Sequence, residues 1–315
     1  MIRSGSFSTF DDMNRPLRIA TRPSPLAKLQ AEMVADRLGI QTELVVVSTS
    51  ADDKPDVPLH SMSGRGVFAK EVQEAVLDKR ADIAVHSAKD LTPSVLPGLA
   101  LGAVPSREDP RDVLIGSDLA GLKPGATIAT GSVRRRAQLS NLRPDLCFCE
   151  LRGNIATRLS KVPTGGAVVM ALAALRRLGL DCRVSEVLDT SVMLPQVGQG
   201  AIAVECRSED EETLALLAGI DNVSVRRCVD AERSFLAALG GNCDVPVGAL
   251  ASICDPDDPR LPVQLEAMVA SIDGSVVLRH CMSTFDPASV GVNMAIYMVE
   301  DCGLGDLLGM EVISD

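Results

Sequence analysis

Hydrophobic positions along the chain follow two spacings, one typical of strands and one typical of helices. Short apolar runs at 17–20, 42–47 and 83–85 have the length and β-branched content of buried strands. Segments 25–38 and 67–79 instead repeat apolar residues at helical spacing. Because strands alternate with helices, this part of the chain is predicted to form one α/β unit.

The same alternation recurs across 112–178, which predicts a second α/β unit. The run at 201–205 has the composition of a strand that returns to the first unit. A helix over 225–239 and strands at 263–272 and 276–280 follow, then a last helical stretch, and they predict a smaller α+β domain.

We therefore predict an α/β fold in which two α/β domains flank a cleft and a small α+β domain completes the chain. The expected boundaries are a disordered extension at 1–16, a first domain at 17–106 with 198–222, an arginine-rich second domain at 107–197, and a third domain at 223–315.

Composition narrows the functional classes. The 315 residues carry 31 Lys+Arg and 42 Asp+Glu, a formal net charge of −11, with no Trp, one Tyr and six Phe. This balance argues against a nucleic-acid or anionic-membrane surface, and the aromatic content is too low for a base-stacking platform. No apolar run reaches the ~18 residues of a membrane span, and the N-terminus lacks a secretory signal, so we expect a cytoplasmic protein.

The cysteines and histidines do not have the spacing of metal ligands. The nine cysteines include no CxxC pair, and the three histidines are far apart in sequence. We expect free thiols, no disulfide framework and no metal.

Charge is distributed unevenly along the chain. Residues 107–177 hold 12 basic and 6 acidic residues, whereas 242–315 hold 2 basic and 12 acidic residues. A positive segment inside an acidic protein predicts a confined anion site rather than a general polyanion surface.

The segment TGSVRRR places Thr130 and Ser132 between a predicted strand and helix, where free backbone N–H groups favour an anion. Arg134 and Arg135 then fall in the first helical turn, where a cation opposes the helix dipole unless a bound carboxylate or phosphate offsets it. The alternative is a solvated basic patch.

Further arginines stand near predicted strand or helix ends. Arg152 and Arg158 lie in LRGNIATR, Arg177 closes a helix, and Arg22 follows the first strand. Because a guanidinium donates two parallel hydrogen bonds to a carboxylate, several of them predict a cleft for a ligand with several acid groups.

Two further residues are candidates for chemistry. Lys89 and Asp90 follow a predicted buried strand, in which His86 is expected to pack. Asp90 is either a turn former or an ionised carboxylate that stabilises a substrate cation. Cys243 follows a helix in a glycine-rich loop and is either a small buried residue or a thiolate that carries a group into the cleft.

Taken together these segments resemble the porphobilinogen deaminase (hydroxymethylbilane synthase) family of tetrapyrrole biosynthesis. The resemblance runs from residue 17 to about 248, in the family's order, through ATRPSPLA, GVFAKE, ADIAVHSAKDL, REDPRD, TGSVRRRAQL, LRGNIATRLSK, LRRLGL, VGQGA and GNCDVPVGA. It implies that the first two domains are similar to periplasmic solute-binding proteins. It also implies a transferase that condenses four porphobilinogen molecules, with loss of ammonia, on a covalent primer and then releases hydroxymethylbilane by hydrolysis.

The resemblance assigns roles by position. Cys243 would hold the dipyrromethane cofactor through a thioether, and Asp90 would be the catalytic carboxylate. The implied cofactor-binding residues, besides these two, are Lys89, Thr130, Ser132, Arg134, Arg135, Arg158 and Gln199. The implied substrate-binding residues are Arg22, Ser24, Gln30, Arg152 and Arg177. Segment 53–66 corresponds to a loop over the cleft, with Arg65 at a usually basic position.

Departures from the family pattern are few. Gly131 replaces a usual serine, Asn242 replaces a usual glycine, and segment 161–166 is short. The expected partner is small-molecule porphobilinogen, with no nucleic acid or membrane, and the expected state is a monomer. The alternative function is a two-domain binding protein for a small polycarboxylate or another polyanion.

Overall fold

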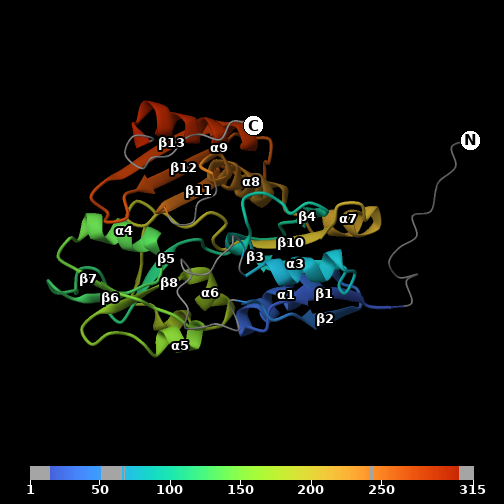
Figure 1. Ribbon diagram of the computed structural model, residues 1–315, viewed down its shortest axis with the longest axis horizontal. Coiled ribbons are helices and arrows are strands. Elements are labelled where there is room, and N and C mark those ends of the chain that lie inside the picture. Colours follow the sequence, from blue (N-terminus) through green and yellow to red (C-terminus); the bar gives the residue numbers. More distant parts are fainter. Residues whose placement is uncertain (1–14, 51–65, 67, 241–244, 305–315) are drawn as a thin grey trace, which may run out of the picture.

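The computed structural model describes residues 15–50, 66, 68–240 and 245–304. Three sheets organise them (Figure 1), two with five strands and one with three. The predicted fold class is confirmed: two α/β units and a C-terminal α+β unit are present. None of the helices in the described ranges has the length and hydropathy needed to cross a membrane.

The first sheet has the order β2-β1-β3-β10-β4. Its strands are β1 Leu17–Thr21, β2 Thr42–Val46, β3 Ile83–Ser87, β4 Leu99–Ala103 and β10 Ile202–Arg207. Its helices are α1 Pro25–Leu38, α3 Lys70–Leu77 and α7 Glu211–Ala218, with a 3₁₀ turn, η3, at Ala88–Asp90. The predicted return strand, β10, is present in the first sheet, and the structure places it antiparallel between β3 and β4.

The second sheet has the order β7-β6-β8-β5-β9 and repeats this plan, with three parallel strands followed by antiparallel ones. Its strands are β5 Asp112–Ile115, β6 Thr127–Ala129, β7 Cys147–Cys149, β8 Ala167–Ala171 and β9 Glu186–Val187. Its helices are α4 Val133–Leu142, α5 Ile155–Leu159 and α6 Leu172–Arg177, with a 3₁₀ turn, η4, at Asp181–Arg183.

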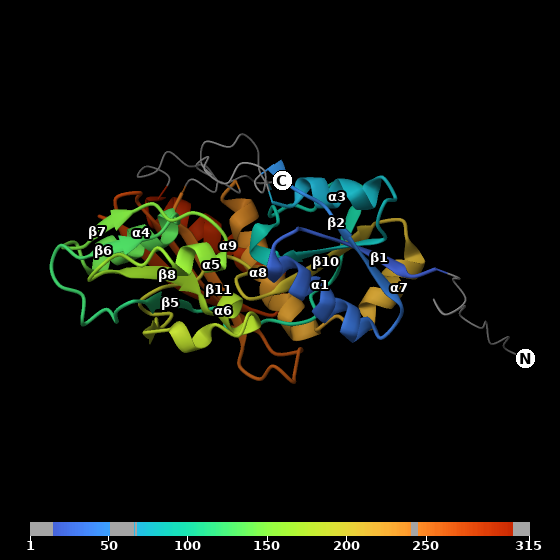
Figure 2. The same cartoon turned by 90° about the horizontal axis from the view of Figure 1, so that it is seen from below.

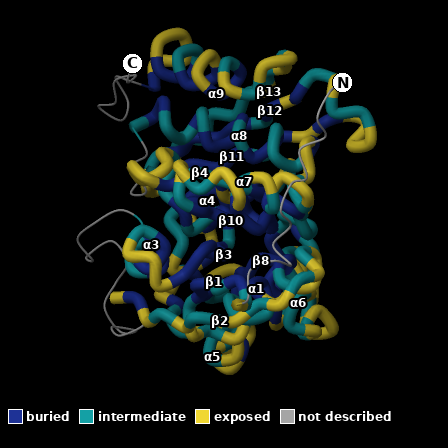
Figure 3. The backbone as a smooth tube through the Cα atoms, turned by 90° about the vertical axis from the view of Figure 1, so that its right-hand side faces the viewer, coloured by how far each residue is buried: buried dark blue, intermediate teal, exposed yellow. Residues whose placement is uncertain are grey.

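The third sheet is antiparallel, in the order β11-β12-β13, and two helices, α8 and α9, share its apolar core. The elements are α8 Val223–Ala238, β11 Val247–Ile253, β12 Val263–Ala270, β13 Val277–Thr284 and α9 Pro287–Ile296, followed by a π-helical turn, η5, at Tyr297–Asp301. Figure 2 shows α8 between this unit and the first sheet. In Figure 3 the central strands β3 and β10 are mostly buried, whereas the outer helices α7 and α9 also carry exposed residues.

Local sequence explains several element ends. Ser24 accepts a hydrogen bond from the Ala27 N–H and caps α1, with Pro25 at the first helical position. Gly39 ends the same helix at φ +64°, in the left-handed region that glycine enters without strain. The helix expected over 67–79 is shorter, α3, although residue 67 lies outside the described part.

Two segments join the first two sheets and run side by side. Arg107 bridges Ala201, and the Glu108 N–H donates to the Gly200 carbonyl at 3.0 Å. A Cβ on Gly200 would lie 2.3 Å from the Glu108 carbonyl oxygen, so this close approach requires glycine. The crossings bring Gln199 beside the second sheet.

Candidate active site

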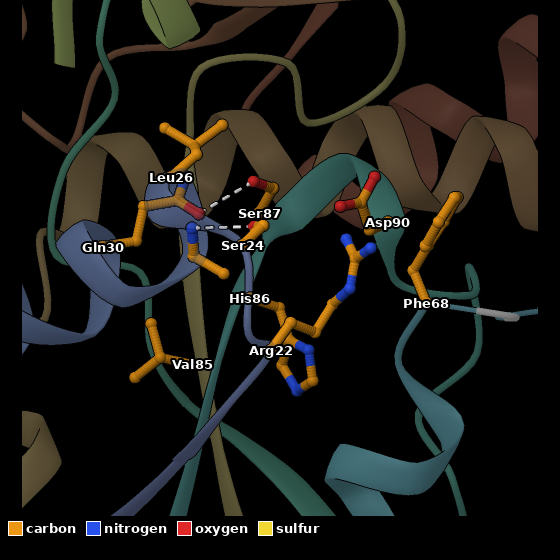
Figure 4. Close-up of a pocket in the computed structure, with 10 residues that line it drawn as sticks. Arg22, Ser24, Leu26, Gln30, Phe68, Val85, His86, Ser87 and Asp90 are labelled. Atoms are coloured by element: carbon orange, nitrogen blue, oxygen red, sulfur yellow. Dashed lines mark hydrogen bonds between the residues drawn. The ribbon is translucent and has the colours of Figure 1, made fainter. Parts of the chain in front are cut away.

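A pocket opens where β1 and β3 end (Figure 4). It is lined by Arg22, Ser24, Leu26, Ala27, Gln30, Phe68, Val85, His86, Ser87 and Asp90. The Ser87 hydroxyl donates to Gln30 Oε1 at 3.0 Å, and the buried Gln30 Nε2 has no acceptor among the described residues. The pocket therefore holds a buried donor that a ligand could use.

Asp90 occupies one side of this pocket, at the end of the turn that follows β3. In Figure 4 the Arg22 guanidinium points toward the Asp90 side chain. Arg22 also lies over the Phe68 ring, 4.4 Å from its centroid, at a cation–π distance. Phe68, which sequence reasoning missed as a site residue, falls in the GVFAKE segment.

Cations of the second unit lie close enough to Lys89 and Asp90 to interact with them electrostatically. Burial is the main reason that the pKa of Lys89 falls to about 8; the Asp90 carboxylate opposes the fall, and Arg135 and Arg158 add to it. Burial likewise lowers the pKa of Arg158 to about 10, with contributions from Arg135 and Arg152 that Asp90 opposes. Residues from both units thus form one electrostatic group around Asp90.

Arg134 and Arg135 converge on one buried carboxylate, Asp112, at the start of β5. An Nη atom of each arginine lies 2.7 Å from an Asp112 oxygen, and Gln199 Nε2 donates to the same carboxylate at 2.9 Å. Asp112 is 0% exposed, and Arg134 and Arg135 are 4% and 7% exposed. Burial disfavours the charged form of Asp112, but the two guanidiniums outweigh it and hold its pKa far below the ordinary range.

Asp112 therefore supplies the negative charge that the sequence pattern required from a ligand. Sequence reasoning missed it, although it closes the REDPRD segment. Whether the two arginines also contact a cofactor stays a prediction, because their guanidiniums already donate to Asp112 and to the carbonyls of Leu194 and Val169.

Other predicted cations keep donors that no protein acceptor uses. The buried Nε atoms of Arg152 and Arg177 have no hydrogen-bond partner within the described ranges. Arg177 donates from an Nη atom to the Gly200 carbonyl at 2.6 Å, and Arg158 donates to the Gly153 carbonyl at 2.8 Å. Buried, unpaired N–H donors beside several positive charges fit a ligand that carries several carboxylates.

The turn before α4 has the predicted form. Ser132 caps the helix by accepting from the Arg135 N–H, and Thr130 Oγ1 accepts from the Ser132 N–H. A Cβ on Gly131 would lie 3.0 Å from the Leu151 carbonyl oxygen and 3.3 Å from Glu150 Oε2. Glycine at this position thus relieves crowding from the following loop.

Four sequence-based predictions fall wholly or mostly outside the described residues: the N-terminal extension at 1–16, the Cys243 attachment point, the Asn242 departure and the loop that contains Arg65. β11 begins at Val247, shortly after Cys243, and pairs with β12 along its whole length. Gly198 and Gln199 adjoin the Asp90 turn, since a Cβ on Gly198 would lie 3.0–3.1 Å from atoms of Ala88 and Lys89.

Comparison with known proteins agrees with this arrangement. A family model described as "Porphobilinogen deaminase, dipyromethane cofactor binding domain" matches residues 17–215. The chain belongs to the porphobilinogen deaminase family. A second model, the porphobilinogen deaminase C-terminal domain, matches 226–300, the range that includes Cys243.

Curated members of the porphobilinogen deaminase family are similar over nearly the full chain. The porphobilinogen deaminase of Roseiflexus sp. (strain RS-1) is 44% identical over 94% of this chain and 100% of its own length. That of Brevibacillus brevis is 40% identical over 92% of this chain and 96% of its own.

Solved structures are similar at a much lower level. The periplasmic VFT2 domain of Bordetella pertussis BvgS is 15% identical, with a TM-score of 0.37, over 65% of this chain and 86% of its own. An amino acid ABC transporter substrate-binding protein from Streptococcus pneumoniae is 16% identical, with a TM-score of 0.37, over 71% of this chain and 96% of its own.

Proposed function

We propose that the chain is a porphobilinogen deaminase, a transferase that makes hydroxymethylbilane from four porphobilinogen molecules with loss of ammonia. The observation that carries the proposal is the group of half-buried cations from both α/β units, Lys89 and Arg158 among them, whose charges interact with Asp90. Family membership over nearly the whole chain supports the same reaction.

The cations are suited to a substrate with acetate and propionate side chains. Arg22, Arg152 and Arg177, with Ser24 and Gln30, are proposed to bind the carboxylates of incoming porphobilinogen. Arg134 and Arg135 pair with Asp112, whereas Arg152 and Arg177 each keep a buried Nε donor without a hydrogen-bond partner among the described residues. Their contribution is positioning, because the substrate carboxylates stay charged throughout the reaction.

The site also fits a dipyrromethane cofactor. Lys89, Thr130, Ser132, Arg134, Arg135, Arg158 and Gln199 are proposed to surround it, and Cys243 to hold it through a thioether. Burial and neighbouring guanidiniums lower the pKa values of Lys89 and Arg158, so both gain from a bound acid. When bound, the cofactor supplies a pyrrole whose free α-carbon is the nucleophile for chain growth.

Asp90 is proposed to act on the substrate. As the aminomethyl C–N bond of porphobilinogen breaks, the pyrrole nitrogen donates its electron pair into the ring and becomes positive, while ammonia leaves. The half-buried Asp90 carboxylate lines the pocket. It can therefore stabilise that positive charge as it develops.

We also propose that the chain acts as a cytoplasmic monomer, with domains at 17–106 plus 198–222, 107–197 and 223–315. The three sheets and the two adjacent crossing segments support this division. Light scattering on the purified protein measures its oligomeric state.

Intact mass tests the proposed function directly. The chain alone has a mass of 33.2 kDa, and a porphobilinogen deaminase carries a dipyrromethane adduct in addition. We expect the adduct on the wild type and on the control Cys254→Ser, which removes an exposed thiol, but not on Cys243→Ser, because a hydroxyl is a far weaker nucleophile than a thiolate.

Turnover of porphobilinogen to hydroxymethylbilane should follow the adduct. A wild type at its sequence mass that binds polycarboxylates without turnover would favour the binding protein instead. An adduct that persists on Cys243→Ser would refute the attachment point.

A further inference from the structure

A cluster of buried polar side chains adjoins the pocket, which one of its members, His86, also lines, and the cluster has no part in the proposed chemistry. Gln73 from α3, His86 from β3, Glu205 from β10 and Arg233 from α8 are all buried. Gln73 Nε2 donates to Glu205 Oε2 at 2.8 Å, and His86 Nε2 lies 3.3 Å from the same oxygen. Side chains from three elements thus meet at the Glu205 carboxylate, and the charge of Arg233 acts on it from α8.

The cluster contacts the chain on both sides of Asp90. On the N-terminal side, His86 lies on β3, four residues before Asp90, and its Nε2 atom is near Glu205 Oε2. On the other side, Arg233 donates from an Nη atom to the carbonyl oxygen of Pro93, three residues beyond Asp90, at 2.8 Å. The segment from His86 to Pro93 is therefore held at both ends by side chains from other elements.

Electrostatics supports this arrangement. Burial disfavours ionisation of Glu205, but the neighbouring His86, Gln73 and Arg233 outweigh it and lower the pKa of the carboxyl. Arg233 is charged within the same low-dielectric region and is stabilised by Glu205 and Asp230. Because a buried charge is costly without its partner, loss of either residue disturbs the other.

Regular pairing between β3 and β10 ends at Ser87, so the Asp90 turn lies beyond the paired part of β3. β10 is in regular register with β3, but its register with β4 shifts between Val204 and Glu205. Beyond Ser87 the Ala88 N–H donates to the Ala201 carbonyl at 3.0 Å, and the Gln196 side chain donates to the Lys89 carbonyl at 3.3 Å. Side-chain contacts at the two ends supply the remaining restraint.

We propose that Glu205 and Arg233 are positioning residues that fix the Asp90 turn from both ends. The proposal rests on the proposed function of Asp90. Neither residue lines the pocket, so both act through the segment between His86 and Pro93. Arg233 also ties this segment to α8, the helix from whose end the chain continues toward Cys243.

Steady-state kinetics on three variants tests the proposal. Glu205→Gln keeps the shape and removes the charge, and Arg233→Met removes the donor to Pro93. Asp82→Asn is the matched control, because Asp82 is a buried carboxylate at the opposite end of β3, paired with Arg18 at 2.9 Å. We expect all three variants to melt below the wild type.

Only the two cluster variants should lose turnover. We expect kcat, calculated per mole of adduct-carrying protein, to fall on the order of 10- to 100-fold, because a small misplacement of a reacting group has effects of this size. KM should change less than about twofold, since the substrate-binding arginines are intact. A purely structural cluster would instead leave kcat near that of Asp82→Asn, and this result would overturn the proposal.

Hydrogen exchange gives a readout that does not depend on the reaction. Exchange at residues 87–93 should be faster in both cluster variants than in Asp82→Asn, and unchanged exchange there contradicts the proposal. If the wild type does not turn over porphobilinogen, the proposed function fails and the exchange result alone decides whether the turn is held. If Arg233→Met does not fold, Arg233→Lys keeps the charge and loses the planar fork, and the same outcomes apply.

Discussion

Replacement of Asp112 by asparagine removes the negative charge that two buried arginines share. Asp112 is 0% exposed and accepts from Arg134, Arg135 and Gln199. In Asp112→Asn one carboxylate oxygen becomes an amide NH₂ group, which turns donors toward a guanidinium that already donates. The variant therefore leaves two buried positive charges without a counterion.

The expected loss of stability is large. Removal of one member of a buried ion pair costs about 3–5 kcal/mol, because the remaining charge is left desolvated and uncompensated. Here one carboxylate serves two guanidiniums, which are 4% and 7% exposed, so solvent relieves little of the cost. We expect at least about 3 kcal/mol, a large part of the ~5–15 kcal/mol that stabilises a typical domain.

Denaturant unfolding of the variant and the wild type measures this loss. Asp145→Asn is the control, because Asp145 pairs with Arg143 at 2.7 Å in the same unit but in contact with solvent, and we expect little change. The low pKa of Asp112 fixes the pH dependence: its contribution is complete at neutral pH and is lost only as pH falls below the ordinary range of ~3.9. An Asp112→Asn protein as stable as the wild type at pH 7 would refute the reasoning.

Three further predictions concern the pocket and its rim. Asp90→Asn should melt near the wild type yet lose about 10²–10³ in kcat, whereas Asp90→Glu keeps a measurable fraction; near-normal turnover of the Asn variant would identify Asp90 as a turn former. Because the pKa of Lys89 is about 8, kcat/KM should fall as pH rises through that value, and Lys89→Arg should abolish the fall in a pH–rate profile. Gly131→Ser should weaken cofactor attachment, measured by intact mass, because its Cβ would lie 3.0 Å from the Leu151 carbonyl; a fully loaded variant would show that the loop yields.

Elements with complete local signals could be predicted from the sequence. The helix over 25–38 has the predicted bounds because Ser24, Pro25 and Gly39 mark both ends. The helix from Val133 to Leu142 begins where the TGSVRRR segment predicts a helical turn, and Ser132 caps it. Here the local signals and the final fold agree, so tertiary contacts did not need to override them.

Elements whose signals depend on distant contacts were missed. β11 was not predicted because its first residues, including Gly248, resemble a glycine-rich loop. A Cβ on Gly248 would lie 3.0 Å from the Leu194 carbonyl oxygen and 3.1 Å from that of Pro195, so this glycine permits close packing within a strand. α7 and the short edge strands β7 and β9 were also missed, because each is too short for its hydrophobic residues to show a helical or strand period.

The candidate site shows the same division. Arg22, Lys89, Asp90, Arg152 and Arg158 could be nominated because each follows a strand or lies in a helix of an α/β unit. Asp112 could not, because its role depends on burial beside two arginines that are distant in sequence. The sequence shows that a side chain is charged, but only the folded structure shows which opposite charge lies beside it.

Asp112 separates the cations of the cleft into two kinds. Arg134 and Arg135 have an internal counterion, so a bound polyacid changes their electrostatic energy least. Lys89, Arg158 and Arg177 have pKa values lowered by burial and no ion pair among the described residues, so a bound carboxylate relieves the cost of their charge. Affinity for an acid-rich chain should thus come mainly from the second kind, while the first kind keeps the turn before α4 in place. Bound carboxylates also raise the pKa of Lys89, so binding of a polyacid above pH 8 is linked to proton uptake by this side chain. These interior cations let a protein with a net negative charge bind a polyacid without a positive outer surface.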